Sequence, residues 1–167
     1  MEPGFSIRLA EERDVNTILG FIQDLAEYEH LRDQVVATPA LLQEWLFDKR
    51  AAQVLLAEEG QEAVGFALFF HNFSTFLGRA GIYLEDLYVI PPRRGRGYGR
   101  ALLGQLARLA QEEGCGRLEW WCLDWNKPSI DFYRSIGAQP MDEWTVYRVS
   151  GAALERLAGP ALSGEGR

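Results

Sequence analysis

The sequence predicts an α/β fold, in which a single domain (residues 1–167) contains a mixed central sheet flanked by helices. The chain has 167 residues and 47% of them are hydrophobic, which suits one compact domain with a substantial core. Segments with the alternating pattern of strands are interleaved with segments of helical spacing. The expected order of elements is β-α-α-β-β-β-α-β-α-β.

The first part of the chain predicts one strand and two helices. Residues 5–10 alternate between apolar and polar side chains, as strands do. Asp14 is expected to cap a helix, because apolar residues recur at helical spacing from Val15 to Ala26. Thr38 followed by Pro39 is typical of an N-cap and a first helical position, so a second helix is expected over 39–47.

The middle of the chain predicts three consecutive strands, at 52–59, 62–73 and 80–90. A short turn at 59–61 indicates that the first two form a hairpin. A longer loop at 74–78 is expected to join the second pair.

The last part begins with a glycine-rich loop, residues 92–100, which leads directly into an amphipathic helix. This helix is expected to bury one apolar face, which consists of Leu102, Leu103, Leu106, Leu109 and Ala110. Gly114 is expected at the C′ position. A strand at 116–123 follows, which implies a right-handed parallel crossover. A short helix at 126–137 and a final strand at 144–150 complete a core of about residues 5–150, and residues 159–167 are expected to form a flexible tail.

Composition excludes several classes of protein. The net charge is −7 and the pI is about 4.9, which argues against a nucleic-acid partner. No apolar run approaches the length of about 18 residues that a membrane span needs, and no secretory signal is readable. Cys115 and Cys122 fit no disulfide framework, and neither they nor His30 and His71 have metal-ligand spacing. We therefore expect no metal, no membrane, reduced thiols and a cytoplasmic protein.

The glycine-rich loop has the chemistry of an anion site. Gly95, Gly97 and Gly99 allow successive backbone N–H groups to point into one concavity. The helix that follows adds its N-terminal N–H groups and the positive end of its dipole, and arginines surround the loop. This pattern favours a pyrophosphate but matches neither a P-loop nor a Rossmann fingerprint. A flexible connector with solvated arginines is the alternative.

Several motifs resemble one known family. Arg94-x-x-Gly97-x-Gly99 resembles the acyl-CoA signature of the GNAT N-acetyltransferase superfamily. Three further segments resemble its spermidine/spermine branch, including the diamine and thialysine relatives: DLAEYE (24–29), YLEDLYV (83–89) and LDWNKPSIDFYRSIGA (123–138). The resemblance covers about residues 5–150. It implies the GNAT fold, acetyl-CoA as co-substrate, a homodimer and direct acetyl transfer to a small primary amine.

The resemblance and the loop chemistry together assign the contacts to acetyl-CoA. Backbone amides of the strand before the loop are expected to hold the pantetheine. The full set expected to bind the co-substrate is Leu87, Tyr88, Val89, Arg94, Gly95, Arg96, Gly97, Tyr98, Gly99, Arg100, Asn126 and Ser129.

An amine acetyltransferase must remove a proton from its acceptor, because alkylamines have pKa values of about 10.4. Glu85, in the strand before the loop, is the candidate base, acting directly or through a water. The alternative is a partly exposed strand carboxylate without a catalytic role. Strict alternation sends the Asp86 side chain to the opposite face, so both carboxylates reach the ligand only if the strand is irregular there, for example at a β-bulge.

Tyr133 is the candidate general acid. Helical spacing places it on one face with Asn126 and Ile130. A phenol with a pKa near 10 can protonate a departing thiolate, and the resemblance implies that this tyrosine lies beside the CoA sulfur. The alternative is a tyrosine that packs in the core with its hydroxyl at the surface.

The resemblance places Tyr28 and Glu29 at the acceptor site, and the alternative for these two residues is a solvated helix end. Glu85 and the adjacent Asp86 are the other two residues expected to bind the acceptor. A diamine, a polyamine or a lysine-like amino acid is expected as the substrate. The aromatic loop at 71–76 has no clear counterpart to the acidic-aromatic loop of the polyamine enzymes, which argues against spermine. Two other functions remain open: a protein N-terminal or lysine acetyltransferase, and a CoA-binding module without turnover.

Overall fold

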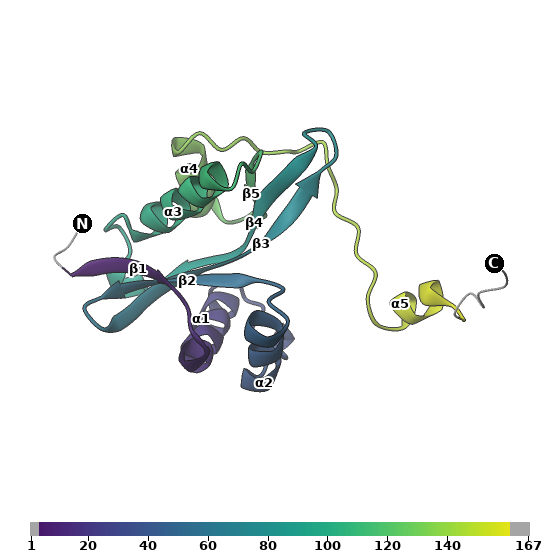
Figure 1. The fold of residues 1–167 in the computed structure, drawn as a ribbon, viewed down its shortest axis with the longest axis horizontal. Helices are drawn as coiled ribbons and strands as arrows, with labels where there is room; N and C mark the ends of the chain where they lie inside the picture. Colours follow the sequence, from purple (N-terminus) through teal and green to yellow (C-terminus); the bar gives the residue numbers. More distant parts are fainter. Residues whose placement is uncertain (1–3, 161–167) are drawn as a thin grey trace. The chain divides into compact units, whose positions relative to one another are not determined.

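The computed structural model describes residues 4–160, and the chain divides into two compact units, Met1–Trp121 and Cys122–Arg167. The first unit contains a five-stranded sheet with the order β1-β2-β3-β4-β5 (Figure 1). Its strands are β1 (Phe5–Leu9), β2 (Gln53–Glu59), β3 (Glu62–Ser74), β4 (Arg79–Val89) and β5 (Leu118–Trp120). The first three pairings are antiparallel and β4 pairs with β5 in parallel, so the predicted mixed sheet and parallel crossover are confirmed.

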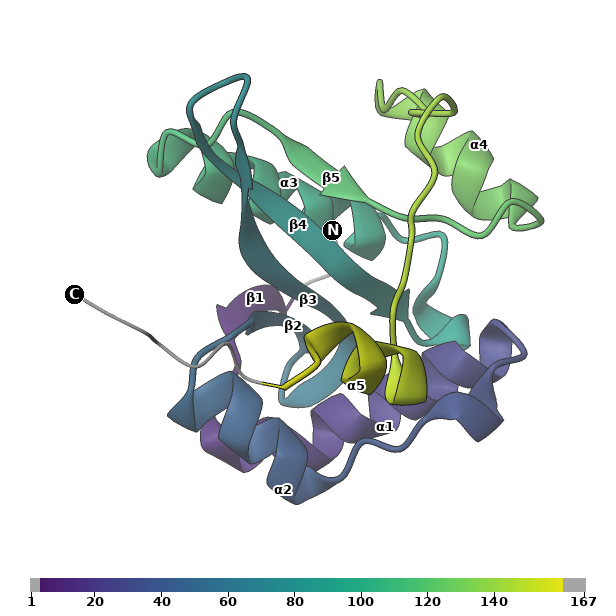
Figure 2. The same cartoon turned by 90° about the vertical axis from the view of Figure 1, so that its right-hand side faces the viewer.

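Helices cover both faces of this sheet. Helices α1 (Val15–Tyr28) and α2 (Pro39–Leu42) lie on one face, and α3 (Tyr98–Glu112) lies on the other (Figures 1 and 2). Short helical turns complete the unit: η1 (Glu12–Asp14), η2 (Arg32–Gln34), η3 (Gln43–Asp48, a π-helix that continues α2) and η4 (Pro91–Arg93). Within residues 4–160, no helix combines the length and the apolar character that crossing a bilayer requires.

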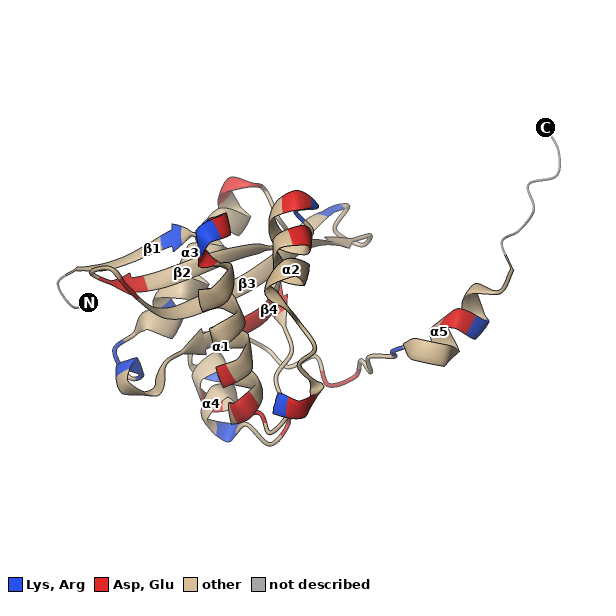
Figure 3. Ribbon diagram, turned by 90° about the horizontal axis from the view of Figure 1, so that it is seen from below, with Lys and Arg blue, Asp and Glu red and all other residues tan. Residues whose placement is uncertain are grey.

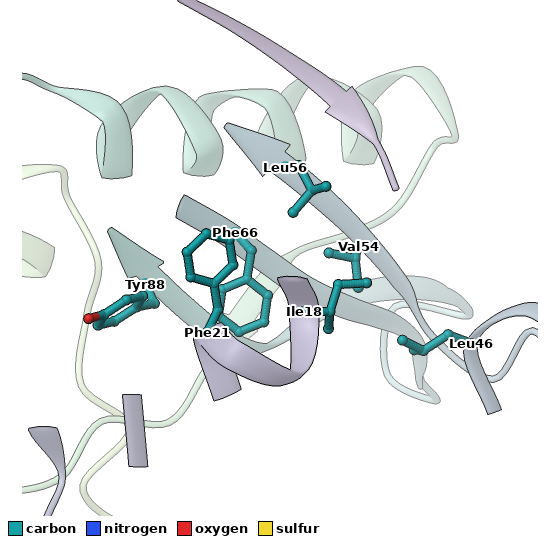
Figure 4. Packing of buried hydrophobic residues seen from close by; sticks show 7 residues of the cluster. All are labelled: Ile18, Phe21, Leu46, Val54, Leu56, Phe66 and Tyr88. Carbon is teal, nitrogen blue, oxygen red and sulfur yellow. The ribbon is translucent and has the colours of Figure 1, made fainter. Parts of the chain in front are cut away.

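One cluster of buried hydrophobic residues lies between the sheet and α1 (Figure 4). Phe21 of α1 stacks on Phe66 of β3, with ring centroids 5.5 Å apart, and contacts Tyr88 of β4 at 6.0 Å. The other members of this cluster are Ile18, Leu46, Val54 and Leu56. Burying each of these aliphatic side chains contributes about 1.5–3 kcal/mol, which holds α1 against the strands that carry the candidate site.

Both helices of the first third begin where the sequence predicts, but for different reasons. Thr38 caps α2 as expected, since its hydroxyl accepts a hydrogen bond from Leu41 N–H at 3.2 Å. Asp14 occupies the N-cap position of α1 without making the side-chain cap bond. Its carboxylate instead binds Arg8 at 2.7 Å and accepts the Glu11 N–H at 2.7 Å. The hydrogen bonds from Arg8 lower the pKa of Asp14 and keep its carboxyl ionised. Because Arg8 lies in β1 and Asp14 precedes α1, this ion pair connects the strand to the helix.

Helix α3 buries the predicted face on the opposite side of the sheet, with Leu102 and Leu106 fully buried. It ends in a Schellman motif, in which Cys115 N–H binds Ala110 O at 2.8 Å and Gly114 N–H binds Gln111 O at 3.2 Å. Gly114 has φ +71°, the left-handed value that the predicted C′ glycine provides.

The second unit contains two helices, α4 (Lys127–Ser135) and α5 (Gly151–Ala158). Helix α4 is the short helix expected from the sequence, and Gly137 follows it with φ +90°. The prediction of a final strand at 144–150 is wrong for the single chain, because these residues pair with no described strand and α5 follows them. A strand needs a neighbour for its backbone N–H and C=O groups. Residues 161–167 of the predicted tail lie outside the described residues.

Candidate active site

The strand that carries the two adjacent carboxylates is irregular at that point. Leu68 of β3 pairs with Asp86 of β4, whereas the next residue, Phe69, pairs with Leu84. Glu85 is therefore an extra residue in β4, which is the β-bulge that the sequence argument required. The bulge reverses the alternation, so Asp86 lies on the α1 face of the sheet, whereas Leu84, before the bulge, lies on the opposite face.

The bulge brings three carboxylates into one electrostatic environment. Burial raises the pKa of Asp86 to about 7, and the negative charges of Glu85 and then Glu29 add to this effect. Burial also raises the pKa of Glu29, which follows the last turn of α1. Glu85 itself is exposed. Figure 3 shows an acidic segment of β4. The carboxylates of Glu29, Glu85 and Asp86 form the acidic end of the candidate site.

Tyr28 lies next to a residue of the predicted co-substrate site. The guanidinium carbon of Arg94 lies 5.2 Å from the centroid of the Tyr28 ring and 5.3 Å from that of Tyr88. Arg94 Nε also donates a hydrogen bond to Val89 O at 2.8 Å. Arg94 thus joins the predicted acceptor residue Tyr28 to the strand before the glycine-rich loop, a link that the sequence did not reveal.

The glycine-rich loop has the open backbone geometry that an anion cradle needs. Gly95 and Gly97 have φ values of +77° and +86°, and Gly97 is the N-cap of α3. A Cβ at either position would meet no heavy atom within 4 Å, so the backbone on that side is open. No described side chain caps the first turn of α3, which leaves its N-terminal N–H groups available to a ligand. Arg96 and Arg100 are exposed around this backbone. These residues fit the pyrophosphate of CoA.

Glu59 at the end of β2 holds the loop in place, a role that no local sequence pattern indicates. Its carboxylate accepts a hydrogen bond from Arg93 Nε at 2.6 Å and one from Arg96 at 3.4 Å, and a short one from the Tyr98 hydroxyl. Tyr98 is almost fully buried and stacks on Phe5, with ring centroids 4.2 Å apart. Tyr98 can therefore offer a ligand only its backbone, whereas its side chain anchors the loop. Residues 59–61 lie next to the glycine-rich loop only once the hairpin has folded. In the sequence, the single indication of this contact is an acidic residue in the predicted turn.

The predicted pantetheine strand lies beyond the end of a strand pairing. β4 pairs with β5 only from Ile82 to Leu84, opposite Leu118 to Trp120. Residues 87–89 continue to pair with β3 on their other side. The edge of β4 that faces away from β3 is thus outside the parallel ladder at Leu87–Val89, which is compatible with amides that bind a ligand.

The remaining predicted residues belong to the second unit. Asn126 precedes α4, is buried, and accepts a hydrogen bond from Ile130 N–H through its backbone oxygen at 3.0 Å. Ser129 and Tyr133 are partly buried in α4. The Tyr133 ring lies against that of Phe132, with centroids 5.5 Å apart. The assignment of these three residues to the CoA site stays a prediction.

A cysteine nucleophile finds no support. Burial and then the Glu113 carboxylate raise the pKa of the Cys115 thiol, whereas a nucleophilic cysteine needs a lowered pKa. Cys122 lies in the second unit and donates to Leu123 O at 3.6 Å.

Comparison with known proteins agrees with this geometry. Residues 12–138 match the model of the acetyltransferase (GNAT) family, and the match runs across the boundary between the two units. The chain is 39% identical to the thialysine N-epsilon-acetyltransferase of Bos taurus, over 92% of this chain and 96% of that protein. It is 31% identical to the L-ornithine N5-acetyltransferase of Arabidopsis thaliana, over 90% of this chain and 86% of that protein.

A solved structure shows the same fold. An integron cassette protein from the mobile metagenome of V. cholerae superimposes with a TM-score of 0.80 and 28% identity, covering 95% of this chain and 99% of that one. The motifs at 24–29, 83–89 and 123–138 had indicated this family and its diamine and thialysine branch. The chain belongs to the GNAT family of acetyltransferases and is an acetyl-transferring enzyme.

Proposed function

We propose that the protein acetylates the side-chain amine of a small cationic substrate such as a lysine-like amino acid, with a diamine or polyamine as related acceptors. One observation carries this proposal: the cluster of Glu29, Glu85 and Asp86 at the β4 bulge, in which the pKa of Asp86 is raised to about 7. Three carboxylates attract a substrate ammonium group and can take up its proton. The activities named for the relatives, on thialysine and on L-ornithine, support the same class of acceptor.

The donor site follows from the glycine-rich loop. Acetyl-CoA supplies the activated acetyl group and leaves as the thiolate of CoA. The N–H groups of Gly95, Gly97 and the first turn of α3 would hold its pyrophosphate, together with Arg96 and Arg100. Arg94, which contacts Tyr28, would adjoin both the donor and the acceptor.

The bulge pair would take the proton from the acceptor. Asp86, with a pKa near 7, is about half ionised at neutral pH and can return its proton to solvent through the exposed Glu85 or through water. Glu85, the base expected from the sequence, therefore acts in this proposal together with Asp86. The negative charge of Glu85 next to it favours the protonated form of Asp86 and so helps to raise the pKa of that carboxyl.

Tyr133 would hold the proton that the departing thiolate needs. Its phenol oxygen can donate at neutral pH, since the ordinary pKa of tyrosine is about 10. The resemblance of 123–138 to the family supports this role for α4.

The acceptor class is tested by measuring CoA release with a thiol reagent. The panel contains thialysine, L-lysine, L-ornithine, spermidine, a lysine-containing peptide and a peptide with a free N-terminus. We expect the highest kcat/KM with an amino acid that carries an ω-amine, and its loss in Asp86→Asn. A higher kcat/KM with either peptide would favour a protein acetyltransferase, and CoA binding without release for any amine would favour a module without turnover.

We also propose a homodimer that uses the segment after α4. Residues 144–149 carry four exposed apolar side chains, namely Trp144, Val146, Tyr147 and Val149. A second copy of the chain could supply the strand that this segment lacks, which would cover these side chains. Light scattering should give twice the chain mass of 18.9 kDa, and a Trp144→Asp variant should shift the protein toward the monomer. A monomeric wild type contradicts this proposal.

A further inference from the structure

Three side chains of metal-ligand type meet at the end of α3 that is opposite to the glycine-rich loop. His71 of β3, Glu113 at the C-cap of α3 and Cys115 just after it each offer one ligand atom, and these atoms all lie within 4.8 Å of one another. His71 Nε2 lies 2.5 Å from Glu113 Oε2, and Cys115 Sγ lies 3.9 Å from the same oxygen. Within the described part of the chain, this is the group that combines a histidine, a thiol and a carboxylate.

Rigid backbone holds the three residues in place. The Schellman motif fixes Cys115 by the hydrogen bond to Ala110 O at 2.8 Å. The next residue, Gly116, donates to Ala80 O of β4 at 2.9 Å, and β4 pairs with β3, where His71 lies opposite Ile82. The ligand atoms thus come from a strand and from a capped helix end whose backbones are hydrogen-bonded to a common strand.

The electrostatics of this corner favour a cation. Glu113 lies at the C-terminus of a 15-residue helix, where the negative end of the helix dipole disfavours a carboxylate. A divalent cation between Glu113 and the neighbouring thiol would reverse this unfavourable term. Both Glu113 and His71 are exposed, so an ion can reach them from solvent.

We propose that His71, Glu113 and Cys115 form a binding site for a late first-row divalent cation, with Zn²⁺ as the best match, separate from the acetyl-transfer site. Nitrogen, oxygen and sulfur are the three ligand types that Zn²⁺ takes in proteins, and three protein ligands leave a fourth position for water. On binding, the Cys115 thiol releases its proton to the buffer, and the thiolate, the carboxylate and His71 Nε2 each contribute an electron pair.

The distances suit this ion after small side-chain movements. Tetrahedral coordination with ordinary Zn–N, Zn–O and Zn–S bonds sets the nitrogen and oxygen about 3.4 Å apart, and the sulfur and oxygen about 3.6 Å apart. The His71–Glu113 pair must therefore open by about 0.9 Å and the Cys115–Glu113 pair must close by about 0.3 Å. The His71 and Glu113 side chains are exposed and can make such adjustments by changes in χ angles, whereas Cys115 is partly buried.

The test uses the full chain under a reductant that does not bind metal, titrated with Co²⁺ as a spectroscopic substitute and with Zn²⁺ in a calorimeter. We expect one ion per chain and a sulfur-to-cobalt charge-transfer band. Cys115→Ser should abolish the band, and His71→Ala and Glu113→Gln should each weaken binding about tenfold or more. The chain offers matched controls, since Cys122→Ser and His30→Ala remove its other thiol and its other imidazole. Both controls should bind as the wild type does.

A second measurement does not depend on the spectrum. Zn²⁺ at about 100 times its Kd should raise the Tm of the wild type by about 5–10 °C, and the three ligand variants should show a much smaller rise. A band that survives Cys115→Ser, a loss caused by Cys122→Ser, or an equal Tm rise in His71→Ala would each overturn the proposal. None of these readouts requires acetyl transfer, so the metal site and the proposed function fail independently.

Discussion

Replacing Asp86 by asparagine tests the carboxylate cluster through stability as well as through activity. Burial, followed by Glu85 and Glu29, raises the pKa of Asp86 in the folded protein to about 7. In the unfolded chain the pKa of aspartate is about 3.9. The folded state therefore binds this proton more tightly than the unfolded state does. Wild-type stability should accordingly fall as the pH rises through the window between about 4 and about 7.

The size of the effect follows from the two pKa values. Between about pH 5.5 and about pH 8.5, ionisation of Asp86 should cost the folded protein about 2 kcal/mol, because each pH unit below the folded pKa is worth about 1.4 kcal/mol. For a chain of this size, that difference corresponds to about 4–8 °C in Tm. The Asp86→Asn variant does not ionise, so its stability relative to the wild type should rise by this amount between the two pH values.

Two assays measure this prediction. Urea unfolding at both pH values gives the difference in the free energy of unfolding between Asp86→Asn and the wild type. CoA release gives kcat/KM, which should rise with pH around 7 in the wild type and fall by about 10²–10⁴-fold in the variant. Glu85→Gln is the matched control: it keeps the Asp86 carboxyl but removes a negative neighbour, so the midpoint of the pH profile should move to lower pH. A stability difference that is the same at both pH values would refute the proposed ionisation, and full activity in Asp86→Asn would refute the catalytic role.

Three further outcomes are expected for the donor site and the general acid. Gly97→Ala places a side chain at φ +86° and should cost about 1–2 kcal/mol of stability and raise the KM for acetyl-CoA, whereas Gly104→Ala inside α3 should be neutral or stabilising. Glu59→Gln weakens the contact to Arg93 and should raise the KM for acetyl-CoA several-fold with little change in kcat, as initial rates over a range of acetyl-CoA concentrations will show. Tyr133→Phe should lower kcat by about 10²-fold or more with the KM values unchanged, and a kcat within a few-fold of the wild type argues against its role as the acid.

Much of the fold could be predicted from local sequence patterns. The helical spacing of α1 and α3 and the glycine after α3 reflect interactions within a few residues, which a linear sequence displays directly. The final strand failed for the opposite reason. The residues at 144–150 are rich in β-branched and aromatic side chains, but a strand also requires a partner, and no local pattern states where that partner is. The π-helix from Gln43 to Asp48 was likewise predicted only as a continuous helix.

The candidate site could be predicted only in part. The resemblance to the family pointed to Glu85, and Asp86 is the next residue in the strand. Strict alternation then showed that a bulge was needed for both to reach a ligand. The environment that raises the pKa of Asp86 depends on burial and on Glu29, more than 50 positions away, and cannot be read from the strand itself. The same holds for His71 and Cys115. They have no ligand spacing in the sequence and come together only because α3 packs against β3 in the folded protein.

The contacts of Glu59 connect two parts of the enzyme that a sequence alignment would treat separately. This residue ends β2, directly before the hairpin turn, yet it binds two arginines and the tyrosine of the glycine-rich loop. Lengthening the hairpin, or grafting another turn at 60–61, would therefore change the loop that receives the CoA pyrophosphate. Substitutions in this turn therefore offer a way to alter donor affinity without changing the glycine-rich loop itself, and screens for weakened CoA binding should return them.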